Sequence, residues 1–313
     1  MTLILSERDV EGLLDMGEVV AVVEEAFRRK GMGEAVNLMR TRARGASSML
    51  NVMHANLSYL GRAGVKAYLS SRSGTKFVFV LFDSVDSTPL AVMGADMLGR
   101  FRTGAASAVA TKHLYRRPSA VVALFGSGRQ ALTQALALRS VMSVEGVRIW
   151  SPNQGRRAAF ARTLMENGFN ARECGSPEDA VAGAQVVTTI TSSHVPFLRK
   201  EMLKDVAHAN ICGANDPAHS EMTVDAVTAF QTVAVDDAVQ AKFEYGELIN
   251  AVEGGVLSWD SVVELGDVVL GRRAPRGKTM FKSGGVAIED VALASALYES
   301  AKADPKVPDV KLF

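Results

Sequence analysis

The feature that most constrains the fold is an apolar run that leads through a glycine-rich turn into a helix-forming run. Residues 121–131 read VVALFGSGRQA, which places Gly126, Gly128 and Ala131 in a Gly-x-Gly-x-x-Ala pattern. In a strand-turn-helix unit the first glycine allows a tight turn, the second lets the backbone approach a pyrophosphate, and the small third residue keeps helix and strand close. Backbone amides and the positive end of the helix dipole then hold the phosphates. The segment predicts a dinucleotide site with the turn residues Gly126, Ser127, Gly128, Arg129 and Gln130.

The pattern around this turn decides between a dinucleotide site and an ordinary strand-to-helix turn, which a bare glycine motif would also fit. After the linker at 116–118, strand-like runs alternate with proline-free helix-like runs. Such alternation indicates βαβ units and a parallel sheet. We therefore expect an α/β fold with a Rossmann-type domain over residues 116–285. The expected strands cover 120–125, 147–150, 186–190 and 210–213, and the first two helices cover 129–141 and 154–166.

The rest of the chain has a different pattern and suggests a second domain, because 313 residues exceed the ~250–300 at which one core stops growing. Apolar residues recur at helical spacing up to residue 30, and short β-rich runs with turn signals fill 39–90. An alanine-rich helix is expected from Thr103 to Leu114, with Arg102 at its start. An amphipathic helix at 286–303 is expected to return to this first domain, which then comprises 1–115 and 286–313.

Composition excludes several other classes of protein. The formal net charge is +1 and the basic residues are scattered, which does not fit a nucleic-acid binder. No run of about 18 uncharged apolar residues occurs, and charged residues begin at Glu7, so we expect neither a membrane span nor secretion. Cys174 and Cys212 have no second pair, so we expect reduced thiols, no metal site and a cytoplasmic location.

The end of the second predicted strand indicates the form of the cofactor. NAD-selective domains usually place an acidic residue there to bind the ribose hydroxyls. This chain reads RIWSPNQGRR at 148–157, without an acid, and Ser151, Asn153, Arg156 and Arg157 are potential donors to a 2′-phosphate. We therefore predict that NADP(H) is preferred and that NAD(H) is possible. The alternative is that both arginines are solvent-facing helix residues.

Five motifs in order give the chain a resemblance to the ornithine cyclodeaminase and mu-crystallin family, which includes archaeal-type alanine dehydrogenases and cyclic imine reductases. The motifs are Arg40-Thr41, Gly64-Val-Lys66, the segment 101–114, the turn at 126–131 and the segment 279–290. The resemblance runs over nearly the whole chain. It implies a homodimer whose substrate-binding and dimerisation domain, an α+β unit, is assembled from the N-terminal part and the C-terminal helix.

The resemblance also implies that Arg40, Lys66 and Arg102 bind the carboxylate of a small substrate facing the nicotinamide. Physical chemistry agrees, because arginine offers a carboxylate two parallel hydrogen bonds and lysine offers a point charge. The start of a helix would further favour an anion beside Arg102. The alternative for each residue is a surface cation or an intramolecular salt bridge. We also expect Thr103, Thr191, Ser192 and Ser283 to bind the cofactor.

One residue departs from the family pattern. Ornithine cyclodeaminases and the related alanine dehydrogenase carry an aspartate that handles the substrate amine, whereas Asn215 occupies the matching position here. An amide cannot take up a proton, which argues against cyclodeamination, although Asp216 is adjacent. We predict hydride transfer at the α-carbon of a small amino acid or its imine, with Lys66 and Asn215 as catalytic residues. Lys66 would donate or accept a proton, because burial near two arginines should lower its pKa. A cyclodeaminase and a non-catalytic, NADP-bound ligand-binding protein remain the alternatives.

Overall fold

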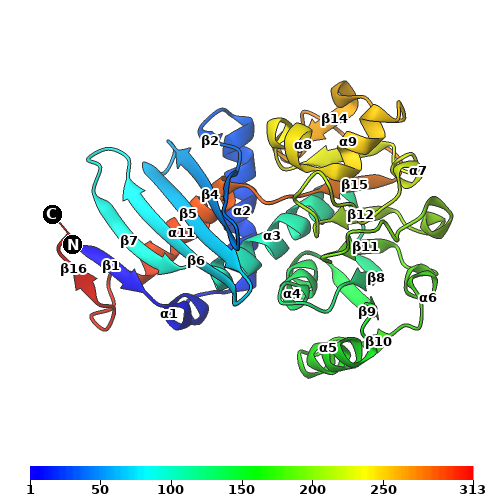
Figure 1. The fold of residues 1–313 in the computed structure, drawn as a ribbon, viewed down its shortest axis with the longest axis horizontal. Coiled ribbons are helices and arrows are strands. Elements are labelled where there is room, and N and C mark those ends of the chain that lie inside the picture. The colour runs from blue at the N-terminus through cyan, green and yellow to red at the C-terminus, as the bar shows by residue number, and fades with distance from the viewer. Residues whose placement is uncertain (313) are drawn as a thin grey trace. The chain divides into compact units, whose positions relative to one another are not determined.

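A computed structural model describes residues 1–312 and contains two compact units (Figure 1). The first unit joins Met1–Arg102 to the chain from Val286 onward, and the second comprises Thr103–Gly285. Helix α3 (Asp96–Leu114) begins in the first unit and ends in the second. No helix among the described residues is both long enough and apolar enough to cross a membrane.

The first unit is built on an eight-stranded sheet that is antiparallel except where β1 pairs with β7. In sheet order its strands are β16 (Asp309–Val310), β1 (Thr2–Leu5), β7 (Pro89–Gly94), β6 (Gly74–Asp83), β5 (Arg62–Ser71), β4 (Ser48–Leu57) and β2 (Ala35–Asn37), with β3 (Thr41–Arg44) paired to β4. The expected β-rich region at 39–90 is confirmed. The N-terminal segment differs from the single helix expected, because it contains β1, α1 (Glu7–Gly12) and α2 (Met16–Gly31).

Local signals explain this break in the N-terminal segment. Ser6 and Asp9 form a capping box at the start of α1, and Asp15 accepts a hydrogen bond from the amide of Glu18 at the start of α2. Each polar cap satisfies an amide that has no partner inside its helix, so each starts a new helix.

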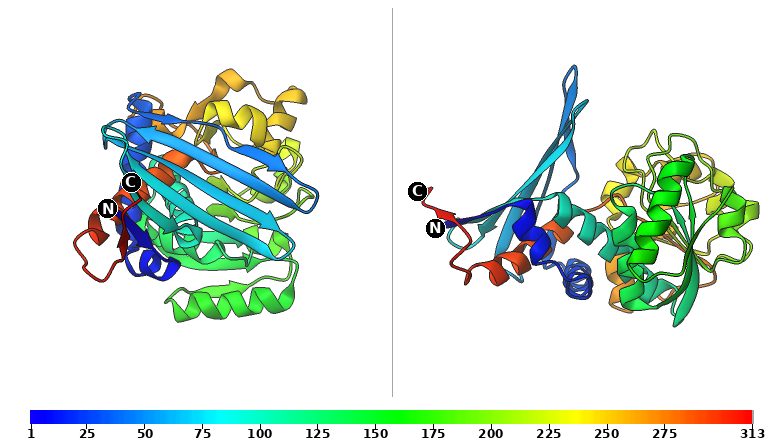
Figure 2. Two further views of the ribbon diagram at one scale, coloured as in Figure 1. Left: turned by 60° about the vertical axis from the view of Figure 1, so that its left-hand side comes forward. Right: turned by 90° about the horizontal axis from the view of Figure 1, so that it is seen from below.

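One face of the first sheet is covered by helices. Helices α2 and α11 (Ala287–Ala301) pack against each other, and α11 crosses β4 and β5 (Figure 2). Side chains on that face of the strands are buried, as the alternation along β4 and β6 shows for Met53, Leu57, Phe79 and Leu81. The intervening residues point to the opposite face, because successive side chains in a strand alternate.

The second unit contains an eight-stranded sheet in which every pairing is parallel, as expected for a Rossmann-type domain. In sheet order its strands are β10 (Ala171–Glu173), β9 (Ser143–Trp150), β8 (Ser119–Phe125), β11 (Val186–Thr189), β12 (His208–Ile211), β15 (Thr279–Lys282), β13 (Thr232–Val235) and β14 (Val262–Glu264). Its further helices are α4 (Ala131–Val141), α5 (Gln154–Glu166), α6 (Pro177–Val181), α7 (Val224–Val227), α8 (Ala238–Glu244), α9 (Gly246–Glu253) and α10 (Leu265–Val269), with 3₁₀ turns η1 (Lys200–Leu203) and η2 (Trp259–Ser261).

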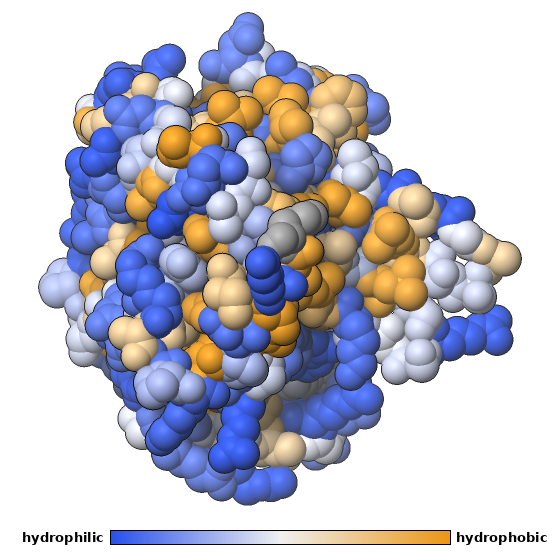
Figure 3. Space-filling view, turned by 90° about the vertical axis from the view of Figure 1, so that its left-hand side faces the viewer, coloured by the Kyte–Doolittle hydropathy of each residue, from blue (hydrophilic) through white to orange (hydrophobic). Residues whose placement is uncertain are grey.

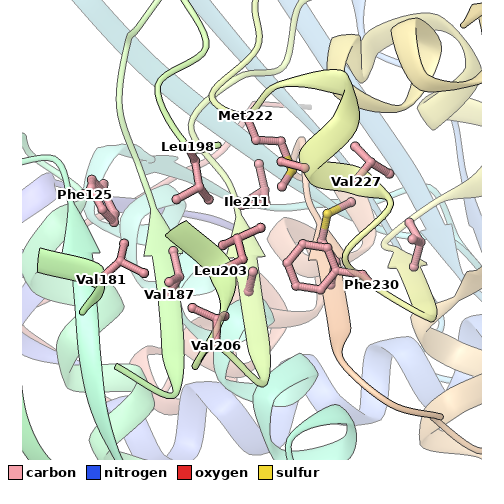
Figure 4. Close-up of a cluster of buried hydrophobic side chains, with 14 of the residues drawn as sticks. Phe125, Val181, Val187, Leu198, Leu203, Val206, Ile211, Met222, Val227 and Phe230 are labelled. Carbon is pink, nitrogen blue, oxygen red and sulfur yellow. The ribbon is translucent and has the colours of Figure 1, made fainter. Parts of the chain in front are cut away.

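The largest apolar cluster of this unit lies between the sheet and the helices on one of its faces (Figure 4). Phe125, Val187 and Ile211 come from three neighbouring parallel strands, whereas Met222 and Phe230 come from the chain around α7. Burial on both faces of the sheet fits the continuous apolar run of β8 after Ser119. This packing fixes the carboxyl ends of the strands, where ligands bind in open parallel sheets.

Candidate functional site

The turn after β8 has the backbone that the glycine pattern requires. Gly126 has a φ of +112°, and a Cβ there would come within 2.6 Å of the Ile190 carbonyl oxygen. A Cβ on Gly128 would instead meet no atom within 4 Å among the described residues. The first glycine is therefore needed for the turn itself, whereas the second leaves open space above the backbone. This opening fits the close approach of a pyrophosphate.

Helix α4 starts directly after this turn, and the amide of its first residue, Ala131, donates a hydrogen bond to the carbonyl oxygen of Gly128 at 3.1 Å. Gln130 precedes the helix, and no side chain among the described residues caps it. The hydroxyl groups of Ser127 and Ser151 lie 2.9 Å apart, which joins the turn to the end of β9. Uncapped amides and the helix dipole form an anion-binding site. The geometry thus fits a dinucleotide held by the predicted residues Gly126–Gln130.

The residues after β9 separate into a structural group and an exposed group. Arg157 is buried and donates a hydrogen bond to the carbonyl oxygen of Ser151 at 2.9 Å, so it stabilises the loop. Asn153 caps α5 by accepting a hydrogen bond from the amide of Arg156 at 2.9 Å. The side chain of Arg156 is exposed. The structure therefore leaves Arg156 as the arginine available to a ligand, and Arg157 is better explained as a structural residue.

The other predicted cofactor residues lie in the same unit. Thr103 is buried in α3, and its carbonyl oxygen accepts a hydrogen bond from Gln134 at 3.4 Å. Thr191 and Ser192 follow β11, where Ser192 is exposed. Ser283 follows β15 and donates a hydrogen bond to Asp236 at 2.8 Å. Thr191, Ser192 and Ser283 thus lie beyond the carboxyl ends of two parallel strands.

The predicted substrate residues of the first unit belong to a buried ionic cluster. Lys66 lies on the covered face of β5, and its Nζ donates hydrogen bonds to both oxygens of Asp290 at 2.7 and 2.8 Å. Arg102 donates a hydrogen bond to Glu289 at 2.7 Å, and its Nε lies 3.1 Å from Asp290. The acidic residues come from α11 and are fully buried. Lys66 and Arg102 are therefore not surface cations, but both form intramolecular salt bridges, which was the other alternative to a carboxylate site.

Burial in this cluster changes the protonation of Lys66. Loss of solvent and the charges of Arg102 and Arg40 lower the pKa of the Lys66 ammonium to about 8, although Asp290 opposes this shift. A lysine with such a pKa exchanges a proton near neutral pH, as general acid or base catalysis requires. The pKa shift agrees in direction with the expectation from the sequence.

Two features of the cluster differ from what the sequence suggested. Helix α3 begins at Asp96, so Arg102 lies inside the helix, and the dipole argument made for it does not apply. The roles of Glu289 and Asp290 were missed. Their signal was two adjacent acids in a helix that is otherwise apolar from Val286 to Leu297. Buried acids of this kind require cationic partners.

Arg40 and Asn215 occupy different settings. Arg40 lies between β2 and β3 and is 6% exposed, and its charge acts on Lys66. Asn215 lies in the loop after β12 and is exposed. The neighbouring Asp216 accepts a hydrogen bond from the amide of Ala218 at 2.9 Å. Among residues 1–312, no group of three or more His, Cys, Asp or Glu residues is arranged to hold a metal ion.

The chain is similar to known proteins over its whole length. The model of the ornithine cyclodeaminase/mu-crystallin family matches residues 1–304. An alanine dehydrogenase of Archaeoglobus fulgidus is 33% identical, covering 100% of this chain and 99% of that protein. A Δ1-pyrroline-2-carboxylate reductase of Thermococcus litoralis, in complex with NADH and L-proline, has a TM-score of 0.94 at 27% identity and covers 99% and 100% of the two chains. An archaeal alanine dehydrogenase dimer with bound NAD has a TM-score of 0.92 at 31% identity. The match covers 100% of this chain and 99% of the dehydrogenase chain.

Proposed function

Because the chain belongs to the ornithine cyclodeaminase/mu-crystallin family, we propose that it is an NAD(P)-dependent oxidoreductase acting at the α-carbon of a small amino acid or its imine. The observation that carries this proposal is the buried ionic cluster of Arg40, Lys66, Arg102, Glu289 and Asp290. The names of the relatives support the reaction class, since they are dehydrogenases and reductases of amino acids and imino acids.

The second unit would bind the cofactor, which supplies or accepts a hydride when bound. The uncapped amides at the start of α4 and the open space above Gly128 would hold the pyrophosphate. Arg156 would contact a 2′-phosphate, since its side chain is exposed beside the end of β9. This contact is the basis for proposing that NADP(H) is preferred, with NAD(H) as a second cofactor.

The first unit would bind the carboxylate of the substrate. Three cations, Arg40, Lys66 and Arg102, are buried in the cluster. Fixed cationic donors of this kind favour a ligand with a negative charge, because arginine offers a carboxylate two parallel hydrogen bonds and lysine offers a point charge. Arg40 and Arg102 would fix the carboxylate, and the α-carbon would then have a defined position.

Lys66 would act as the acid or base of the reaction. In the direction of imine reduction, its ammonium would give a proton to the substrate nitrogen, and in amine oxidation the neutral amine would accept one. Asp290 would orient Nζ and preserve part of its positive charge. Asn215 would contribute a hydrogen bond rather than a proton, because an amide does not titrate. The absence of an acid at this position disfavours cyclodeamination of ornithine.

We also propose that the chain forms a homodimer through the open face of the first sheet. Apolar side chains exposed on that face include Leu50 and Val78 at 40% and Leu69 at 48% exposure. A shallow pocket of about 300 Å³ on the same sheet is lined mainly by apolar residues, among them Val36, Val65 and Phe82. Figure 3 shows apolar side chains gathered among polar ones on this side of the first unit. Extensive exposed apolar surface marks interaction sites, and a relative in this family is described as a dimer.

The proposed reaction is tested by following NAD(P)H absorbance with three groups of compounds. These are 2-oxo acids with ammonia, cyclic imines that carry a carboxylate, and free amino acids including ornithine. We expect cofactor oxidation with an imine or with a 2-oxo acid and ammonia. Ammonia release from ornithine without net cofactor turnover would instead identify a cyclodeaminase. Tight ligand binding without turnover in any group would identify a binding protein.

A further inference from the structure

A second buried ionic network lies in the cofactor-binding unit, and its centre is Glu221. Both oxygens of this carboxylate accept hydrogen bonds from loops at the carboxyl ends of β11 and β12. One oxygen accepts from the hydroxyl group of Thr189 at 2.6 Å and from the amide of Gly213 at 2.7 Å. The other accepts from the amide and hydroxyl group of Thr191 at 2.8 and 2.7 Å. Glu221 thereby ties two consecutive loops to one side chain.

Glu221 is in turn held by a buried ion pair. Its own amide donates a hydrogen bond to Glu247 at 2.9 Å, and Glu247 lies 2.9 Å from the Nζ of Lys282. Lys282 also donates a hydrogen bond to the carbonyl oxygen of Ala214 at 2.7 Å. All three charged side chains are at most 1% exposed. Glu221 and Lys282 therefore contact Gly213 and Ala214, the two residues that precede Asn215.

We propose that Glu221, Glu247 and Lys282 are positioning residues that hold Thr191 and Asn215 in place for the nicotinamide half of the cofactor. This inference rests on the proposed function. The network acts on loops that follow the strands, where ligands of open parallel sheets bind. The network contacts Thr191, which we assign to the site, and it contacts Ala214, which directly precedes Asn215.

Stability alone does not account for this network. Burying three charges is costly, and well-packed apolar residues of similar volume often give equal or greater stability. Glu221 also accepts hydrogen bonds from the amides of Thr191 and Gly213, which lie beyond the ends of β11 and β12. By contrast, His208 and Thr279 form a buried hydrogen bond of 2.8 Å at the amino ends of β12 and β15 in the same sheet. That pair provides a matched structural control.

The ionised form of Glu221 is essential to this role, because four donors face its two oxygens. The variant Glu221→Gln keeps the size of the side chain but replaces one acceptor oxygen with an NH₂ group, which faces two donors. Two hydrogen bonds are lost and a donor-donor contact is created. We expect the loops to loosen while the glycine-rich turn after β8 stays intact, since the four donors to Glu221 belong to Thr189, Thr191 and Gly213 at the ends of β11 and β12.

The experiment compares Glu221→Gln with Thr279→Val, which removes the buried hydrogen bonds of the Thr279 hydroxyl with His208 and Leu114 at the opposite end of the sheet. Hydrogen exchange is measured on the cofactor-free proteins, and binding of NADH and of ADP-ribose, which lacks the nicotinamide, is measured by titration. In Glu221→Gln we expect the amides of Thr191 and Gly213 to exchange about tenfold faster and NADH to bind about tenfold more weakly. Binding of ADP-ribose should change less than about twofold, and Thr279→Val should leave all three quantities within about twofold.

The results distinguish a wrong positioning role for Glu221 from a wrong proposed function. Unchanged loop exchange in Glu221→Gln, or equal weakening of NADH and ADP-ribose, would overturn the inference while the proposed function stands. Failure of the unmodified chain to bind any pyridine nucleotide would overturn the proposed function instead. If Glu221→Gln does not fold, Thr189→Val removes one of the four donors to the same carboxylate. It should then give a smaller change in the same direction, and an unchanged NADH affinity would again contradict the inference.

Discussion

Lys66 and Asp290 are joined by two hydrogen bonds, in which one lysine nitrogen contacts both oxygens of the carboxylate at 2.7 and 2.8 Å. Lys66 is 2% exposed and Asp290 is fully buried. Two opposing effects set the pKa of the lysine. Burial and Arg102 lower it to about 8, whereas Asp290 raises it. Asp290 therefore tunes the proton transfer that we assign to Lys66.

The pH dependence of the reaction should follow this titration. For imine reduction, kcat/KM should fall as the pH rises through about 8, because Lys66 loses the proton that it must donate. The variant Asp290→Asn removes the group that raises the pKa, so the same decline should begin at a lower pH. Initial rates measured from pH 6 to 10 would show this shift. An unchanged profile in Asp290→Asn would contradict the tuning role.

Replacing Lys66 should affect turnover more than cofactor binding. We expect Lys66→Met to lower kcat about 100-fold or more, in the range of a lost general acid, while NADPH affinity stays within about twofold. Lys200→Met, at an exposed position of the other unit, serves as the control and should change neither quantity. Steady-state kinetics and fluorescence titration separate the two effects. Equal turnover in the two variants would remove Lys66 from the mechanism.

Preference for NADP(H) should depend on Arg156. Because its exposed guanidinium would pair with the 2′-phosphate, Arg156→Ala should weaken NADPH binding about tenfold and leave NADH nearly unchanged. Arg162→Ala changes another exposed arginine of α5 and should alter neither affinity. Fluorescence titration with both cofactors provides the measurement. Equal or tighter binding of NADH by the unmodified chain would disprove the predicted preference.

The open face of the first sheet should control oligomerisation. Val78→Asp places a charge on that face of β6, where dimerisation would desolvate it, so we expect the dimer dissociation constant to rise at least about 100-fold. Val85→Asp, at a turn position that is 87% exposed, is the matched control and should leave the dimer intact. Light scattering after size-exclusion chromatography gives the mass of each variant. A dimeric Val78→Asp protein would assign the interface elsewhere.

Much of the fold could be predicted because local sequence patterns indicate its strands and helices. The alternation after residue 118 predicted the parallel sheet, and the apolar run before Gly126 marked β8. The motifs also identified the family, which the match over residues 1–304 confirms. The strands β10, β13, β14 and β15 were not predicted, and β15 pairs with β12 and β13, from which it is separated by more than 40 residues of sequence. Pairing between such short, distant segments depends on the tertiary packing.

The candidate site was only partly predictable. Lys66 and Arg102 stood out as cations beside apolar or alanine-rich segments, and the structure brings them into one buried cluster. Their acidic partners come from residues nearly 200 or more positions later, a separation that periodicity does not reveal. Arg156 and Arg157 are adjacent in the sequence, which does not distinguish their roles. In the structure both lie in the first turn of α5, where Arg156 is exposed and Arg157 is buried.

The order in which the units can fold during translation follows from the position of α11. Residues 103–285 are contiguous, so the second unit can form as soon as they leave the ribosome. The first unit must wait, because Lys66 and Arg102 lack their counter-charges until Glu289 and Asp290 are synthesised. Nascent chains arrested shortly before Val286 should therefore yield a protease-resistant second unit and a cleavable N-terminal segment. Folding of the first unit is therefore completed only when α11 is synthesised, because its two acids neutralise Lys66 and Arg102, which are synthesised much earlier.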